Sequence, residues 1–121
     1  MNRPAVQPGQ SPEQHQQVYD QWKDKISGQQ SQIELLKREL DVTQREYRLR
    51  EAAMYGDAGE RLRNQAQWDK EDAEYKQKIA EKQQALDDAK QKMSDLQEDA
   101  RKSGVPSSVR ESDKTSSPTQ P

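Results

Sequence analysis

The sequence contains no cysteine and no phenylalanine, and leucine, isoleucine and valine together supply only 15 of its 121 residues. This share lies well below the roughly 20 % under which disorder becomes the default expectation. Without cysteine, disulfides, thiol catalysis and thiolate metal sites are excluded. With so little apolar surface, we expect either a largely disordered chain or long helices that bury a thin seam between them.

Long hydrophobic runs and an excess of charge of one sign are also missing. The apolar runs, of which residues 52–55 are typical, are far shorter than the ~20 residues of a membrane-spanning helix. The formal net charge is −2, and basic and acidic residues alternate without the basic face that nucleic-acid binding requires. We therefore predict no membrane insertion and no nucleic-acid partner.

The first residues of the chain lack the apolar stretch of a secretion signal. As written, the chain is expected to be cytoplasmic. The cell envelope is the alternative location if a signal precedes this sequence.

Proline occurs only at the two ends of the chain, which leaves residues 13–105 without any. Because proline interrupts helices, this gap predicts continuous helix. Ser11 and Gln14 have the spacing of a capping box at the start, and basic residues followed by Gly104 are typical of a helix end. We predict a helical region that starts near residue 11 and stops near residue 103.

Composition divides the chain into four predicted segments. They are a disordered N-terminal tail (1–10), a first helical segment (11–63) with a possible break near Gly28, a second helical segment (64–103) and a disordered C-terminal tail (104–121). The tails contain too little apolar surface to offset an ordering cost of about 1–2 kcal/mol per residue.

Within the helical region, apolar residues recur at steps close to seven, the spacing of a coiled-coil seam. The twelve residues predicted to form this helix-packing seam are Ile26, Ile33, Leu36, Leu40, Tyr47, Met54, Trp68, Tyr75, Ile79, Leu86, Met93 and Leu96. Three polar residues at seam positions, Gln29, Thr43 and Lys82, are expected to set the register. Since two helices cannot bury this seam fully, we expect self-association through it.

The seven-residue frame slips by four residues in the region of Gly56 and Gly59. Such a slip marks either a chain reversal or a stutter in a continuous coiled coil. We predict an all-α fold made of long coiled-coil helices, as an antiparallel helical hairpin with disordered tails. A continuous dimeric rod is the main alternative, and a single helix held by acid–base pairs at i,i+4 spacing is the other.

Two pairings of the hairpin are compatible with the pattern. The first places Leu40 opposite Tyr75 and reverses the chain at residues 57–58. The second places Met54 opposite Tyr75 and reverses the chain near Asn64, where a further capping pattern occurs. Packing favours the first pairing, whereas capping favours the second, and we place the turn around Asn64.

Residues that could support catalysis or bind a metal are scarce. His15, the only histidine, has no carboxylate cluster at ligand spacing and is expected to be solvated. The many carboxylates alternate with lysines, whereas a catalytic pair needs a partly dry cavity that raises one pKa. We predict no catalytic, metal-binding or cofactor-binding residue.

Residues 52–63 (AAMYGDAGERLR), Trp68 and residues 95–106 (DLQEDARKSGVP) resemble a group of uncharacterised bacterial coiled-coil proteins. The resemblance extends over about residues 20–110 and implies no activity, substrate or catalytic residue. Relatives of this type can begin with a secretion signal, which this chain lacks.

The sequence therefore predicts a non-enzymatic coiled-coil protein without a cofactor. It would act through helix–helix association, either with itself as a homo-oligomer or with another helical protein. The alternative is an envelope- or surface-associated helical spacer whose tails bind partners.

Overall fold

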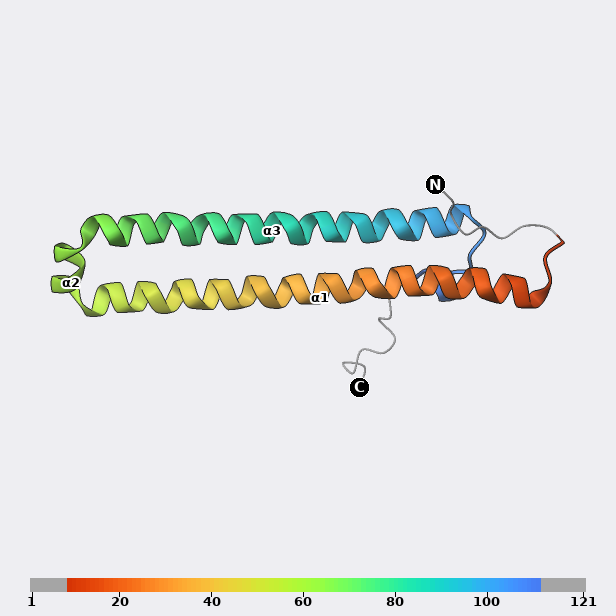
Figure 1. Ribbon diagram of the computed structural model, residues 1–121, viewed down its shortest axis with the longest axis horizontal. Helices are drawn as coiled ribbons and strands as arrows, with labels where there is room; N and C mark the ends of the chain where they lie inside the picture. The colour runs from red at the N-terminus through yellow and green to blue at the C-terminus, as the bar shows by residue number, and fades with distance from the viewer. Residues whose placement is uncertain (1–8, 112–121) are drawn as a thin grey trace. The chain divides into compact units, whose positions relative to one another are not determined.

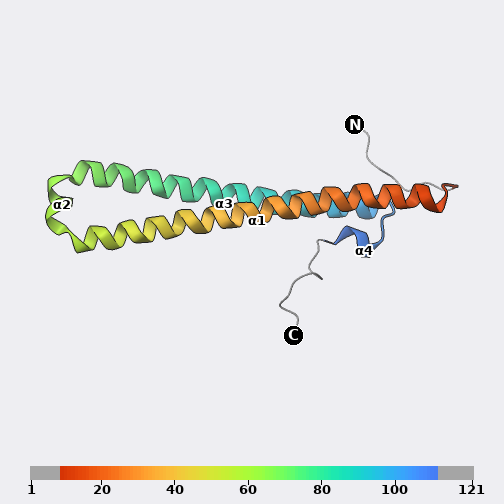
Figure 2. The ribbon, with the colours of Figure 1, turned by 60° about the horizontal axis from the view of Figure 1, so that its bottom comes forward.

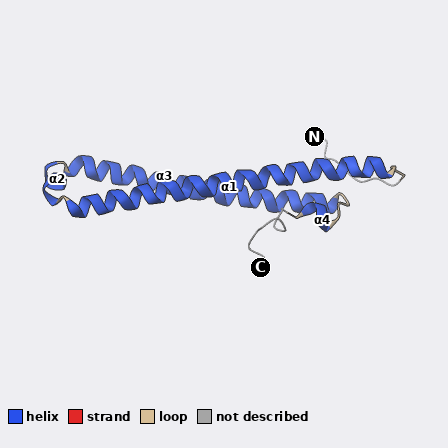
Figure 3. Ribbon diagram, turned by 90° about the horizontal axis from the view of Figure 1, so that it is seen from below, coloured by secondary structure: helices blue, strands red, loops and turns tan. Residues whose placement is uncertain are grey.

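The computed structural model describes residues 9–111, and the predicted tails fall largely outside this range, at residues 1–8 and 112–121. The regular elements of the described range are the helices α1 (Pro12–Gly56), α2 (Ala58–Arg63), α3 (Gln65–Lys102) and α4 (Ser107–Arg110) (Figure 1). Between residues 9 and 111 there is no strand, as the colouring of Figure 3 makes clear. The predicted all-α class is confirmed.

Helix α1 begins with the reciprocal hydrogen bonds of a capping box. The Gln14 amide donates to Ser11 Oγ at 3.2 Å, and the Ser11 amide donates to Gln14 Oε1 at 2.7 Å. These bonds satisfy amides that have no partner within the first turn of a helix. The helix then passes through Gly28 without interruption, so the possible break at that position does not occur.

The described helices belong to two compact units. Unit 1 comprises Met1–Ile33 with Asp88–Pro121, and unit 2 comprises Glu34–Asp87. Each unit contains a part of α1 and a part of α3.

In unit 2 the chain reverses through α2 and forms an antiparallel helical hairpin (Figure 1). Asp57 caps α2 by accepting a hydrogen bond from the Glu60 amide at 2.9 Å. Asn64 ends α2, and its amide donates to the Glu60 carbonyl at 3.0 Å. Both predicted turn positions are thus used, with a six-residue helix between them. The continuous rod is wrong, because the chain reverses here.

The inserted helix also shifts the register away from both predicted pairings. Tyr75 lies against Tyr47, with 6.0 Å between the ring centroids. One predicted pairing placed Tyr75 opposite Leu40 and the other placed it opposite Met54, so the observed partner lies midway between them. A reversal through α2 replaces the tight turn that each pairing assumed, which explains the difference.

In unit 1 the first part of α1 and the last part of α3 pack around Trp22 and Ile26, which are 1 % and 2 % exposed. Helix α3 ends in a Schellman motif: the Val105 amide donates to the Ala100 carbonyl at 3.0 Å, and Gly104 has φ +85°. Val105 is itself only 3 % exposed, the hydrophobic contact that accompanies this motif.

The chain remains ordered beyond this motif, where α4 follows (Figure 2). Arg110 Nε donates to the Val105 carbonyl at 2.9 Å and so ties α4 to the turn. The expectation of disorder from residue 104 onward is therefore wrong for residues 104–111. Burial of Val105 supplies the apolar contact that composition alone did not reveal.

Alanine at two glycines of unit 1 should change stability in opposite directions. Gly28 is an exposed position inside α1 with nothing within 4 Å of an added Cβ, so Gly28→Ala should raise the free energy of unfolding by about 0.5–1 kcal/mol. Gly104→Ala should lower it by about 1–2 kcal/mol, because φ +85° is unfavourable for alanine. Urea unfolding followed by circular dichroism measures both. If both substitutions changed the free energy of unfolding in the same direction, this account would be contradicted.

Candidate functional site

The structure places all twelve predicted seam residues away from full solvent exposure. The five buried members are Ile26, Ile33, Leu40, Leu86 and Met93. The other seven are partly buried, and Trp22 adds the largest buried side chain. The seam is therefore occupied by packing within the units.

The polar seam residues find partners in different ways. In unit 1, Gln29 is 9 % exposed and its Nε2 donates across the helix pair to the Ala89 carbonyl at 2.9 Å. In unit 2, Thr43 Oγ1 donates to the Glu39 carbonyl of its own helix at 2.9 Å. Lys82 lies 3.7 Å from a Glu39 carboxylate oxygen. Of these contacts, the bond from Gln29 fixes register most directly, since it joins α1 to the backbone of α3.

Arg50 forms the centre of a polar cluster in unit 2. Its guanidinium pairs with the Glu71 carboxylate, and its Nη2 donates to the Trp68 carbonyl at 2.7 Å. The same guanidinium lies 4.2 Å from the centroid of the Trp68 ring and 5.9 Å from that of Tyr75. Only 13 % of the Arg50 side chain is exposed, so these contacts replace water around its charge. The sequence reasoning missed Arg50, since its partners come from another helix.

Beside this cluster, the Tyr47 hydroxyl donates to Asp72 Oδ1 at 2.7 Å. The hydrogen bond lowers the pKa of Asp72, and the Lys76 ammonium 3.1 Å away lowers it further. The same bond raises the pKa of Tyr47. Hydrogen bonds from Gln67 and then Arg50 lower the pKa of Glu71. These shifts favour the ionised carboxylates and do not produce the raised pKa that a general acid requires.

Possible sites for metals and small ligands are limited in the described part of the chain. No group of three or more His, Cys, Asp or Glu side chains in residues 9–111 could hold a metal ion. His15 is partly buried, and its ring centroid lies 6.3 Å from that of Tyr19. Over the same residues, no helix combines the length and the apolar character that crossing a membrane demands.

A second row of apolar residues lies outside the seam. Leu35, Val42 and Leu49 in unit 2 are 42 %, 53 % and 72 % exposed and follow one another at seven-residue steps along α1. We call these three residues the outer stripe. The sequence reasoning missed them because it followed only the two seam positions of each heptad. The signal was present, since each lies two residues after a seam residue.

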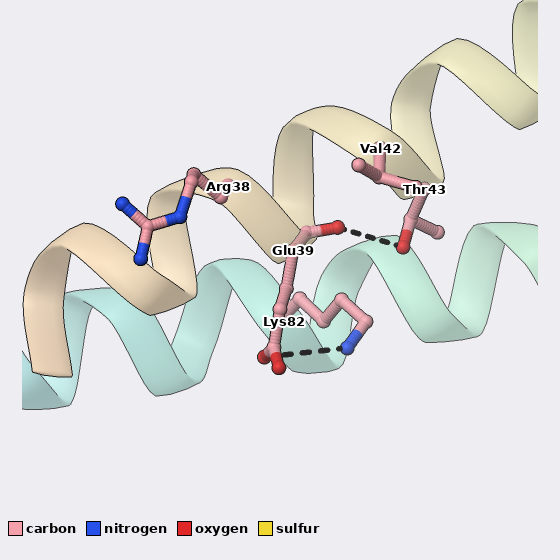
Figure 4. A pocket seen from close by; sticks show the side chains of 5 residues that line it. All are labelled: Arg38, Glu39, Val42, Thr43 and Lys82. Carbon is pink, nitrogen blue, oxygen red and sulfur yellow. Dashed lines mark hydrogen bonds and ion pairs between the residues drawn. The ribbon is translucent and has the colours of Figure 1, made fainter.

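The middle of the outer stripe borders a hollow of about 290 Å³ between α1 and α3 (Figure 4). Its lining residues are Arg38, Glu39, Val42, Thr43 and Lys82. Figure 4 shows Arg38 and Glu39 on the turn that precedes Val42, with Lys82 reaching toward Glu39 from α3. Apolar and charged side chains of α1 thus alternate around one surface.

Comparisons of the chain with protein-family models, curated proteins and solved structures found no match. The resemblance to bacterial coiled-coil proteins stays a prediction.

The seam can be tested with a double substitution in unit 2. Leu40 is 8 % exposed and Leu36 is partly buried, so Leu36→Asp with Leu40→Asp removes apolar burial and places two charges in the seam. We expect the free energy of unfolding to fall by about 3 kcal/mol or more, and the helical circular dichroism signal to decrease cooperatively. Leu49→Asp, at a position 72 % exposed on the same helix, is the matched control and should leave helicity unchanged. Unchanged helicity in the double variant would refute the seam assignment.

The Tyr47–Asp72 bond predicts a specific response to acid. Because the folded-state pKa of Asp72 lies below its unfolded value, the carboxylate contributes stability above about pH 4 that is lost as pH falls through the folded-state pKa. Tyr47→Phe should lower the free energy of unfolding by about 1 kcal/mol at neutral pH and should make it depend less on pH in the acid range. Urea titrations from neutral pH to about pH 3 measure both effects.

The control for this experiment is Tyr55→Phe, since Tyr55 is 78 % exposed. It should follow the wild type at every pH. If the free energy of unfolding of Tyr47→Phe fell as steeply with decreasing pH as that of the wild type, the bond to Asp72 would make no contribution to the acid dependence.

Proposed function

We propose that this chain is a non-enzymatic helical protein that acts through helix–helix association. Its partner is a second copy of itself or another helical protein. The observation that carries the proposal is the outer stripe, with three large aliphatic side chains exposed in a row on one helix. Single exposed apolar residues are ordinary on protein surfaces, but a row at heptad spacing is the kind of face that a partner helix covers.

The distribution of apolar residues supports this proposal. The seam residues are buried or partly buried within the units, whereas the residues of the outer stripe are exposed and therefore more accessible to a partner. The outer stripe extends over residues 35–49, about 21 Å of helix at 1.5 Å per residue. It is therefore long enough for about four turns of a partner helix to pack along it.

The polar clusters also favour association over catalysis. The charges around Arg50 are paired with one another, and the nearby hollow of about 380 Å³ is lined by charged side chains and one tyrosine: Arg50, Glu71, Glu74, Tyr75 and Lys78. In the hollow beside Val42 the polar side chains are likewise engaged, since Thr43 Oγ1 donates to the Glu39 carbonyl and Lys82 lies 3.7 Å from a Glu39 carboxylate oxygen.

Replacement of the outer stripe by serine tests the proposal. Leu35→Ser, Val42→Ser and Leu49→Ser together should leave most of the helicity intact but abolish association, because they remove apolar area without touching the seam. Sedimentation equilibrium over a range of concentrations should give a mass above the monomer for the wild type and the monomer mass for the variant. Tyr55→Ser with Leu62→Ser, at positions 78 % and 72 % exposed, is the control and should behave as the wild type.

If the wild type is a monomer at all concentrations, self-association is excluded and the partner must be another helical protein. The immobilised wild type must then retain a helical protein from an extract that the serine variant does not retain. Equal retention by both would contradict the proposal. The spacer alternative predicts instead that deletion of residues 1–8 and 112–121 abolishes binding, whereas association through the outer stripe survives this deletion.

A further inference from the structure

The buried residues of unit 2 all lie at the end of its hairpin that is remote from α2. They are Leu40, Thr43 and Leu86, whereas no residue from 44 to 85 is buried. We call residues 44–85 the distal hairpin, which includes α2 (Figure 1). Its large side chains are partly buried at most. The apolar burial that stabilises a helix pair is therefore weakest in this part of the unit.

Polar and ring contacts take the place of that burial, and they converge on two residues of α1. Within the distal hairpin, the hydrogen bonds, ion pairs and ring contacts that join α1 to α3 all involve Arg50 or Tyr47. Tyr47 makes one hydrogen bond and one ring contact across the pair. Arg50 makes the larger share, since its guanidinium contacts Glu71, Trp68 and Tyr75.

We propose that the Arg50 guanidinium is a latch for the distal hairpin, which opens by local unfolding while the helix pair of unit 1 stays closed. The inference does not depend on the proposed function, because it concerns an opening within one chain. Arginine suits this role, since its planar group holds a carboxylate, a carbonyl oxygen and an aromatic face at the same time. Loss of this one side chain's contacts removes most of the cross-helix contacts together.

Solvent reaches the latch from one side. The Arg50 side chain is only 13 % exposed, but its partner Glu71 is 38 % exposed. A hollow of about 380 Å³ is lined by both residues. Water therefore competes for the carboxylate without crossing an apolar layer, so the ion pair holds the distal hairpin closed by a small margin.

Unit 1 is stabilised by burial instead. Trp22 and Ile26 of α1 are 1 % and 2 % exposed, and Met93 and Ala100 of α3 are also buried. The hydrogen bond from Gln29 to the Ala89 carbonyl of α3 adds a buried polar contact. All of these contacts lie outside residues 44–85, so opening of the distal hairpin leaves them intact.

Opening changes the surface that the chain presents. Helices that separate lose most of their stability, because packing supplies more of it than intrinsic propensity does. The rings of Tyr47, Trp68 and Tyr75, which the closed pair partly covers, then become exposed. The chain exchanges between a closed and an open form, and a change at Arg50 shifts the populations of the two.

Amide hydrogen exchange followed by mass spectrometry tests the difference between the two units in the wild type. Exchange in residues 69–80 should be at least about tenfold faster than in residues 89–100, because the first segment needs only a local opening. Both segments belong to α3, so the comparison is made within one helix. Equal protection of the two segments would show that the chain opens only as a whole and would overturn the proposal.

Substitution of Arg50 tests the latch itself. Arg50→Met keeps a long unbranched side chain but removes the charge and every hydrogen-bond donor. Exchange in residues 69–80 should become about tenfold faster or more, while exchange in residues 89–100 stays at the wild-type rate. Arg48→Met, at an exposed position two residues earlier, is the matched control and should leave both rates unchanged.

The outcomes of this substitution are distinct. Unchanged exchange in residues 69–80 of Arg50→Met, or equal acceleration in both segments, would overturn the proposal. If circular dichroism shows that Arg50→Met does not fold, Arg50→Lys takes its place. It keeps the charge without the planar fork and should accelerate exchange in residues 69–80 alone, by less than Arg50→Met would. Wild-type exchange in Arg50→Lys would overturn the guanidinium latch.

Discussion

Burial of a narrow apolar stripe between paired helices is the interaction on which this structure depends. Only 15 large aliphatic residues are available in 121 positions, so no helix can be covered on all sides. In unit 1 the burial centres on Trp22 and Ile26, and it extends to Val105 through the turn that ends α3. Each polar group within so thin a seam needs an internal partner, which Gln29 obtains from a backbone carbonyl.

Unit 2 achieves packing with a different set of side chains. Tyr47, Trp68 and Tyr75 are only partly buried, and their polar or π-electron surfaces are used by Arg50 and Asp72. Aromatic residues supply large apolar area yet keep a polar atom that needs a partner. Electrostatic contacts consequently have a larger part in joining the helices here than they have around Trp22 in unit 1.

The sequence predicted features that depend on neighbours along the chain. The capping box at Ser11 follows from local spacing, and so does the helix end before Gly104. The position of the chain reversal was harder to predict, because Asp57 and Asn64 can each cap a helix. The chain uses both residues, with α2 between them. The register depends on that extra helix. The role of Arg50 depends on residues about twenty positions away, which no local pattern indicates.

The outer stripe has a different physical basis from the seam, and this difference separates folding from association. Seam residues are buried or partly buried within each unit, whereas Leu35, Val42 and Leu49 remain exposed on α1. In the association proposed above, a partner binds the outer stripe without opening a helix pair, so the entropic cost of ordering α1 is met by folding and not by binding.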